Sequence, residues 1–219
     1  MQRYEFPMAA LQNGTVLEGL VHIQGFLDSS LAFRASCREG ICGSCAMHIN
    51  GKYRLSCETR LENLGSNEVT VRPLGHFPVI RDLVVDMKDF WSKYQSIKPY
   101  LLPGEEDPEN ERHQTRDERA AVDPMVDCIL CACCQAGCSI TALDPDYLGP
   151  AILLHVNRFL QDSRDDAVEE RLRLATNESG IYRCHSIFTC TEVCPKDLDP
   201  KGSISAITRK AMGRKFGFR

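Results

Sequence analysis

Hydrophobic and polar positions along the chain predict strands in the N-terminal half and helices in the C-terminal half. In the first half, Asn50 and Gly51 join two short runs at 46–49 and 52–55. Asn-Gly between two such runs is a strong signal for a β-hairpin, because both residues accept the left-handed backbone of a two-residue turn. Apolar positions alternate again at 69–71, which predicts a further strand.

One helix is predicted beside this sheet. Thr15 and Glu18 have the T-x-x-E spacing of a capping box, in which the two side chains satisfy backbone groups at a helix start. Leu17, Leu20 and Val21 follow on one helical face. A small sheet crossed by one helix is typical of a β-grasp domain.

Helical periodicity dominates the C-terminal half. The clearest patterns run over 150–161 and 167–175, with Asp162 or Asp165 as the expected N-cap of the second helix. We therefore expect this half to be all-helical, so that the chain as a whole is an α+β protein.

A charged segment separates the two halves. Prolines and a glycine interrupt regular structure over 99–108, and charged residues are dense as far as residue 123. We expect an exposed connection there with one helical turn. The predicted organisation is a first domain at 1–100, a charged linker at 101–123 and a second domain at 124–219.

Composition narrows the class of protein. The net charge of −4 over 219 residues argues against a nucleic-acid binder. No apolar run approaches the roughly 18 residues of a membrane span, and the N-terminus resembles neither a secretory nor a transit signal. Residues 201–219 are basic without an acid, which predicts either a solvated tail or a docking edge for an acidic partner or an anionic lipid surface.

Eleven of the 12 cysteines fall into three ligand patterns. The first is C-x4-C-x2-C with a distant fourth member, the spacing of plant-type [2Fe–2S] proteins; its members are Cys37, Cys42, Cys45 and Cys57. The second is C-x2-C-x2-C-x3-C, at Cys128, Cys131, Cys134 and Cys138. The third repeats that spacing at Cys184, Cys190 and Cys194, but its second position is Ile187.

The second and third patterns are the paired runs of two-cluster ferredoxins, where the last Cys of each run ligates the cluster of the other. This rule predicts a [4Fe–4S] cluster on Cys128, Cys131, Cys134 and Cys194. It leaves Cys138, Cys184 and Cys190 for a second cluster. Three thiolates cannot cap four irons, so Ile187 predicts [3Fe–4S] there.

Alternatives to iron–sulfur clusters are structural zinc and disulfides. Zinc sites favour two separated C-x2-4-C pairs, which these runs are not. Disulfides suit small secreted chains, whereas free thiolates need a reducing compartment. Cys133 fits neither run and is expected to be an unligated buried thiol. Gly40 and Gly43 are expected to let backbone N–H groups approach the sulfurs.

With these motifs the chain resembles the iron–sulfur subunits of the succinate:quinone oxidoreductase family, the succinate dehydrogenases and fumarate reductases. The resemblance extends from residue 15 to residue 207. It rests on the strings SCREGICGSCAMHING (36–51), FPVIRDLVVDM (77–87), CILCACC (128–134), LGPA (148–151), RFLQDSRD (158–165) and RCHSIFTCTEVCPK (183–196).

The resemblance implies a plant-type ferredoxin domain followed by a helical two-cluster ferredoxin domain. It also implies the partners: a flavoprotein subunit with FAD, and a membrane anchor that binds quinone. The complex would lie on the cytoplasmic face of a bacterial inner membrane, or on the matrix side in mitochondria. This chain would pass electrons between flavin and quinone as part of an enzyme, without substrate chemistry of its own.

Departures from the family pattern gather at the quinone end. Ser139 and Leu143 stand where members commonly have Pro and Trp, and Thr208 stands where they often have Lys. The resemblance places His185, Ile187 and Ser139 near quinone. The family also has a strand ahead of the segment that matches residues 2–6, so either the sheet is expected to lack it here or the start of the sequence is misassigned.

Other functions fit parts of the pattern. The same subunit can serve a fumarate reductase that runs in the opposite direction. A free-standing soluble ferredoxin and a zinc-stabilised interaction module are the remaining alternatives, and iron with acid-labile sulfide excludes the latter.

Overall fold

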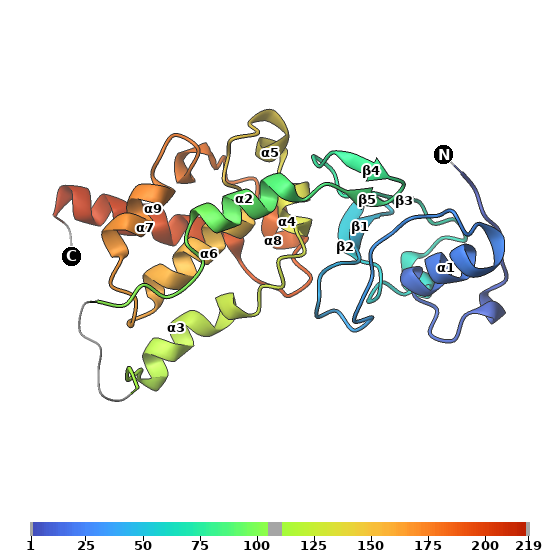
Figure 1. The fold of residues 1–219 in the computed structure, drawn as a ribbon, viewed down its shortest axis with the longest axis horizontal. Helices are drawn as coiled ribbons and strands as arrows, with labels where there is room; N and C mark the ends of the chain where they lie inside the picture. The colour runs from blue at the N-terminus through green and yellow to red at the C-terminus, as the bar shows by residue number, and fades with distance from the viewer. Residues whose placement is uncertain (1, 105–110, 218–219) are drawn as a thin grey trace.

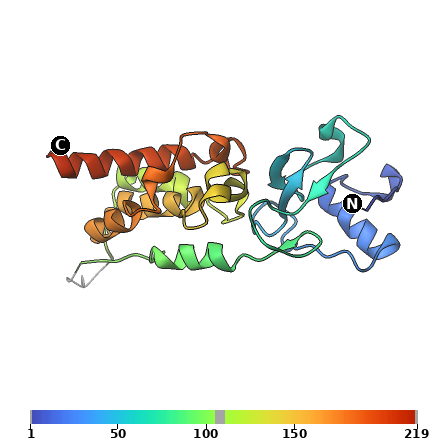
Figure 2. The same cartoon turned by 90° about the horizontal axis from the view of Figure 1, so that it is seen from above.

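The computed structural model describes residues 2–104 and 111–217. A strand-bearing N-terminal part and a helical C-terminal part lie end to end along the long axis (Figure 1). The second view, turned by 90°, shows the same division (Figure 2). The predicted α+β organisation is therefore confirmed.

The predicted hairpin is present with its predicted bounds. Strands β1 (Ala46–Ile49) and β2 (Lys52–Leu55) pair antiparallel. Asn50 and Gly51 have φ values of 44° and 83°, the left-handed conformation that the turn requires. Strand β3 (Val71–Arg72) pairs with the other edge of β1, giving the order β2-β1-β3.

Two short strands form a separate hairpin, β4 (Val79–Arg81) and β5 (Val84–Val85). Within residues 2–45, the described segment ahead of β1, no strand is present. The start of the chain is held through Tyr4, whose hydroxyl donates to Asp28 at 2.6 Å.

Helix α1 (Val16–His22) begins at the predicted capping position. The Thr15 hydroxyl accepts from the Glu18 backbone N–H at 3.1 Å. The Glu18 carboxylate in turn accepts from the backbone N–H groups of residues 12–14. The predicted apolar face was wrong at Val21, which is 39% exposed. Val16, the first residue of the helix, is buried instead and packs with Leu20 against Met47 and Ile49 of β1.

The remaining helices complete the chain. They are α2 (Lys88–Ser96), α3 (Arg116–Val126), α4 (Cys133–Gly137), α5 (Ser139–Leu143), α6 (Pro150–Gln161), α7 (Val168–Ala175), α8 (Thr189–Glu192) and α9 (Pro200–Phe216). Short 3-10 helices occur at Met8–Ala10, Leu61–Leu64 and Ile181–Arg183, and a short π-helix at Ile23–Leu27. The buried helix α6 packs against α3, α7 and α9.

The expected linker contains more helix than one turn. Helix α3 has 11 residues and starts with a complete capping box between Thr115 and Glu118. Val122 and Met125 bury its inner face. The charged outer face conceals this short apolar stripe in the sequence, and the boundary expected at 123/124 falls inside the helix. Residues 105–110 of the linker lie outside the described residues.

The predicted N-cap of α7 was wrong. The cap position is Ala167, and Asp162 lies at the end of α6, where its carboxylate pairs with Arg164 at 2.8 Å. Asp165 is buried and accepts two hydrogen bonds from Arg171. An ion pair with a buried guanidinium thus replaces the cap.

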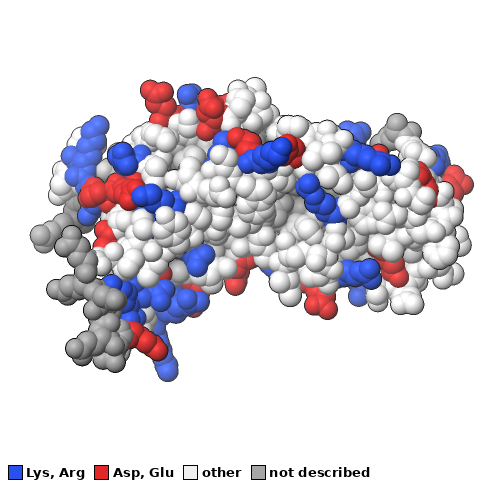
Figure 3. Space-filling model, in the orientation of Figure 1, with Lys and Arg blue, Asp and Glu red and all other residues white. Residues whose placement is uncertain are grey.

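The basic C-terminal segment is mostly helix rather than a solvated tail. Helix α9 packs along α6, and the Lys210 ammonium donates to the Leu160 carbonyl at 2.8 Å. The Arg214 guanidinium pairs with Glu169. Figure 3 shows Lys and Arg side chains over the end of the molecule where α9 terminates. Residues 218–219 lie outside the described residues.

Candidate metal centres

The first cysteine set converges at the end of the sheet. Cys45 directly precedes β1, and Cys57 follows β2. Because β1 and β2 pair in register, their Sγ atoms come within 3.3 Å of each other, and both residues are buried. Cys37 and Cys42 lie in the preceding loop, the former half-buried and the latter exposed.

Backbone N–H groups of this loop point at the sulfurs. The amides of Glu39, Ile41 and Cys42 donate to the Cys37 Sγ at 3.4, 3.3 and 3.2 Å. The Gly40 amide donates to the Cys57 Sγ at 3.3 Å. Such donors stabilise negative charge on sulfur and help to set the potential of a cluster. The expected role of Gly40 matches this geometry.

The thiols of the first set differ in acidity. Burial raises the pKa of Cys57 to about 12. The Ser44 hydroxyl, 3.1 Å from the Cys42 Sγ, lowers the pKa of Cys42 to about 6. A buried thiol gives up its proton only when positive charge compensates the thiolate, as iron ligation does.

The second set surrounds a hollow between the two cysteine runs. Cys128, Cys131, Cys134 and Cys194 line one space of about 370 Å³, which includes its open mouth. Cys128 and Cys131 come from the turn between α3 and α4, Cys134 lies in α4 itself, and Cys194 follows α8. Burial raises the pKa of Cys128 to about 11 and also raises the pKa of Cys134 and of Cys194. One member of the later run thus joins three of the earlier run.

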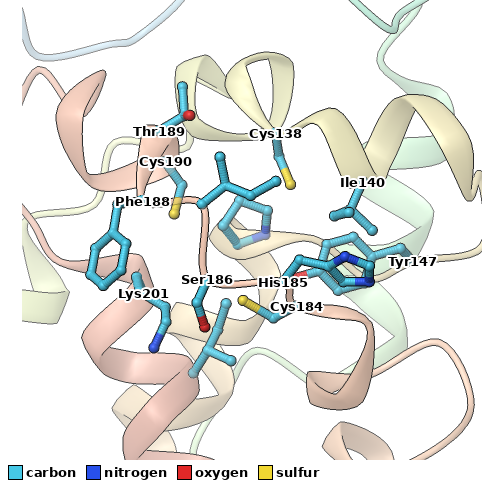
Figure 4. A pocket seen from close by; sticks show the side chains of 13 residues that line it. Cys138, Ile140, Tyr147, Cys184, His185, Ser186, Phe188, Thr189, Cys190 and Lys201 are labelled. Carbon is cyan, nitrogen blue, oxygen red and sulfur yellow. The ribbon is translucent and has the colours of Figure 1, made fainter.

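The third set surrounds the matching hollow. Cys138, Cys184 and Cys190 line a space of about 350 Å³ that also includes its open mouth. Figure 4 shows these three side chains around it, with Tyr147 on one side. Burial raises the pKa of Cys190 to about 11. Ile187 lines the same hollow and is 52% exposed.

Cys133 lies outside both hollows in the described part of the chain. It is fully buried, and its thiol interacts with Cys131, which raises the pKa of Cys133 and lowers that of Cys131. An inward-facing Cys133 fits the expected unligated thiol.

The donor sets fit iron–sulfur clusters. Each set presents thiols, the ligand such clusters use, and two sets surround hollows of several hundred Å³ rather than a point. Among the described residues, no three His, Cys, Asp or Glu side chains form a group that could hold a single metal ion. Four thiols face one hollow, and three thiols with an isoleucine face the other.

Of the three residues expected near quinone, His185 and Ile187 line the third hollow and Ser139 does not. His185, Ser186 and Ile187 form an exposed loop that lines the third hollow, together with Phe188. Ser139 is exposed on α5 and does not belong to that lining. 

Among the residues of this hollow that the sequence did not single out, Lys201 and Tyr147 carry functional groups beside the cysteines. Lys201 lines it, with its ammonium 5.3 Å from the centre of the Phe188 ring. Tyr147 is buried against the cysteines, and burial raises its pKa. A lysine at the second position of the helix that follows the last cysteine run was the available signal for the first. The sequence carries none for Tyr147. Thr208 donates to the Ile204 carbonyl within α9 and is outside the described lining.

Comparison with known proteins agrees with this arrangement. Residues 1–92 match the 2Fe-2S iron-sulfur cluster binding domain family, and residues 124–198 match the 4Fe-4S dicluster domain family. A chain of the Mycobacterium smegmatis Sdh1 complex, solved in the apo form, is similar with a TM-score of 0.86 and 30% identity; the match covers 92% of this chain and 86% of that one. The fold and the cysteine sets therefore define an iron–sulfur electron-transfer subunit.

Curated relatives narrow this class. The mitochondrial succinate dehydrogenase [ubiquinone] iron-sulfur subunit 1 of Oryza sativa subsp. japonica is 48% identical over 89% of this chain and 70% of its own length. The succinate dehydrogenase iron-sulfur subunit of Coxiella burnetii is 44% identical over 94% of this chain and 88% of its own length. The chain belongs to the family of succinate dehydrogenase iron–sulfur subunits.

The family fixes the cofactors and the role. The subunit carries [2Fe–2S], [4Fe–4S] and [3Fe–4S] clusters and transfers electrons within an oxidoreductase complex. No described helix is both long enough and apolar enough to span a bilayer.

Proposed function

We propose that this chain conducts electrons between the FAD of a flavoprotein subunit and quinone in a membrane anchor, with the ligands assigned as follows. Cys37, Cys42, Cys45 and Cys57 hold [2Fe–2S]; Cys128, Cys131, Cys134 and Cys194 hold [4Fe–4S]; Cys138, Cys184 and Cys190 hold [3Fe–4S]. The clusters, once bound, accept and release single electrons. The protein supplies their thiolates, N–H donors and exclusion of water.

The exchange of cysteines between the two runs is the observation that carries this proposal. Cys194 lies with the earlier run and Cys138 with the later one, each around its own hollow. The exchange ties α4 to α8, which pack against each other. Ile187 supports the three-iron assignment, because its side chain offers no ligand where the repeat places a fourth thiolate.

The surfaces beside the [2Fe–2S] and [3Fe–4S] sites fit different partners. At the [2Fe–2S] end, Ile41 is 61% exposed beside the exposed Cys42, which suits a flavoprotein docked over this loop. At the [3Fe–4S] end, Ile187 and Phe188 are both 52% exposed, and Leu143 is 81% exposed. These apolar side chains suit the anchor, which would hold the subunit against the cytoplasmic or matrix face of the membrane.

Quinone needs a hydrogen-bond donor at the third hollow, because a buried unpaired carbonyl costs about 1–3 kcal/mol. His185, Ser186 and Lys201 are polar residues of this lining. We assign the donor role to this group, with the anchor supplying the remainder. The proposal keeps two domains, residues 1–100 and a helical domain that begins with α3 (Arg116–Val126), because the boundary expected at 123/124 falls inside that helix.

Rapid-freeze EPR on the complex tests the proposed path. Succinate must reduce the [2Fe–2S] and [3Fe–4S] clusters and quinone must reoxidise them; a [4Fe–4S] centre of lower potential passes electrons without accumulating them. His185→Ala must raise the apparent KM for quinone while the cluster signals and the succinate-to-dye activity stay unchanged. If quinone kinetics are unchanged in His185→Ala and the anchor supplies no donor, His185 does not donate to quinone. A [3Fe–4S] cluster that succinate cannot reduce contradicts the path itself.

A further inference from the structure

Gly43 lies where the loop of the first cysteine set touches the loop of the second. It is buried between Cys42 and Cys45, with φ +71°. A Cβ atom built on Gly43 would lie 2.8 Å from the Ile129 carbonyl oxygen and 3.0 Å from the Cys131 Cα. Both are backbone atoms, which cannot rotate away as the end of a side chain can.

This contact distinguishes Gly43 from the other described glycines with positive φ. Gly51 and Gly65 have no atom within 4 Å of a built Cβ. Gly40 would meet the Glu58 carboxylate, the mobile end of a side chain. Only at Gly43 does the backbone of a different domain fill the space.

We propose that Gly43 is a positioning residue that sets the separation between the [2Fe–2S] and [4Fe–4S] sites. The inference rests on the ligand assignment proposed above. Gly43 stands between two ligands of the first cluster, and Cys131 is itself a ligand of the second. A side chain at residue 43 must either push the two loops apart or displace Cys131.

The close contact at Gly43 is expected to affect electron transfer, because it controls the distance between two clusters. Packing in protein interiors leaves no slack for a methyl group that meets two backbone atoms closer than contact distance. Both loops are fixed at each end by cysteine ligands, so the strain is relieved at the junction between the domains. Electron passage between neighbouring centres depends steeply on their separation, which makes this junction the sensitive point.

The test compares Gly43→Ala with Gly65→Ala in the complex assembled with its flavoprotein and anchor. The two glycines have similar φ values, +71° and +63°, so alanine introduces similar backbone strain at each. Only the first substitution meets another loop. The control therefore removes strain from the comparison and leaves the contact.

Two readouts report the separation. The first is the enhancement of [2Fe–2S] spin relaxation by its reduced neighbour in the dithionite-treated complex. The second is the delay between reduction of the first and third clusters after mixing with succinate. In Gly43→Ala, with all three clusters present, we expect weaker enhancement and a several-fold longer delay. Gly65→Ala is expected to match the wild type in both.

Each outcome decides the matter. Unchanged relaxation and delay in a fully loaded Gly43→Ala complex overturn the positioning role and leave the ligand assignment intact. A missing cluster signal in the wild-type complex contradicts the proposed function itself. If Gly43→Ala assembles no [2Fe–2S] cluster, the wild-type complex provides the test. There the [4Fe–4S] cluster must enhance the spin relaxation of [2Fe–2S] more than the [3Fe–4S] cluster does. A larger enhancement by [3Fe–4S] contradicts the contact.

Discussion

The guanidinium of Arg171 donates to the carboxylate of Asp165 at 2.6 Å, and the two side chains are 1% and 0% exposed. Arg171 also donates to the backbone carbonyls of Ile97, Lys98 and Tyr100, and lies 4.2 Å from the centre of the Phe159 ring. One buried arginine thus holds the segment that leaves the first domain against helices α6 and α7.

Loss of this arginine is expected to destabilise the protein severely. Arg171→Ala leaves the Asp165 charge buried and unpaired, which costs about 3–5 kcal/mol. Arg119→Ala is the matched control. It removes the exposed i,i+4 pair with Asp123, which costs only about 0.5 kcal/mol. Denaturant unfolding followed by circular dichroism measures both variants, and equal losses contradict the clamp.

His155 predicts an acid-sensitive stability. It is 2% exposed on α6, neither ring nitrogen has a hydrogen-bond partner, and burial lowers its pKa to about 4. In the unfolded chain the His155 imidazole therefore becomes protonated near pH 6.5, whereas in the folded chain it stays neutral at that pH. Stability is full above pH 6.5 and falls as the pH drops toward 4, by about 1.4 kcal/mol at pH 5.5.

His155→Leu tests this origin, because leucine keeps the apolar contacts without a titrating group. The fall in the free energy of unfolding between pH 7 and 5.5 is expected to shrink by that amount relative to the wild type. His22→Leu, at the half-buried end of α1, is the control. The same pH dependence in wild type and His155→Leu assigns the acid sensitivity to other groups.

Neighbouring cysteines are expected to differ sharply in cluster assembly. Cys134 lines the second hollow, whereas Cys133 faces the core. Cys133→Ser should retain all three EPR signals, and Cys134→Ser should lose or remodel the [4Fe–4S] signal. Loss of that signal in the Cys133 variant alone shifts the ligand register by one residue.

Ile187 is expected to decide the nuclearity of the third cluster. Ile187→Cys adds a thiol to the lining of its hollow, so the oxidised protein should lose its three-iron EPR signal and gain iron. Ile187→Val is the control, with no ligand and little change in volume, and it should keep the signal. A three-iron signal that survives in Ile187→Cys, with its thiol inaccessible to alkylation, contradicts the proposed blocking role.

The sequence predicted what local chemistry determines. Asn50-Gly51 specified the hairpin and its register, and Pro150 to Gln161 formed the predicted helix, because turn chemistry and helical periodicity act over a few residues. The exchange of Cys194 and Cys138 was predicted from the spacing together with the exchange rule of two-cluster ferredoxins. The two residues line separate hollows, and the cluster that each ligates stays a prediction.

Two features without a local signal involve partners distant in sequence, and a third lies in a segment whose charge masks its apolar residues. Asp165 was expected to cap a helix, but its partner Arg171 also bonds a segment about seventy residues earlier, as the hydrogen bond to Ile97 shows. Helix α3 was missed because charged side chains outnumber its two buried apolar ones. The contact of Gly43 with Cys131 joins two domains and has no local signature.

Ligand-specific variants test the exchange of cysteines between the two runs. EPR and iron analysis of Cys194→Ser and Cys138→Ser, prepared side by side, separate the two clusters. The account predicts that Cys194→Ser loses or alters [4Fe–4S] while [3Fe–4S] persists, and that Cys138→Ser loses [3Fe–4S] while [4Fe–4S] persists. The opposite pattern, in which each variant damages the cluster of its own run, contradicts it.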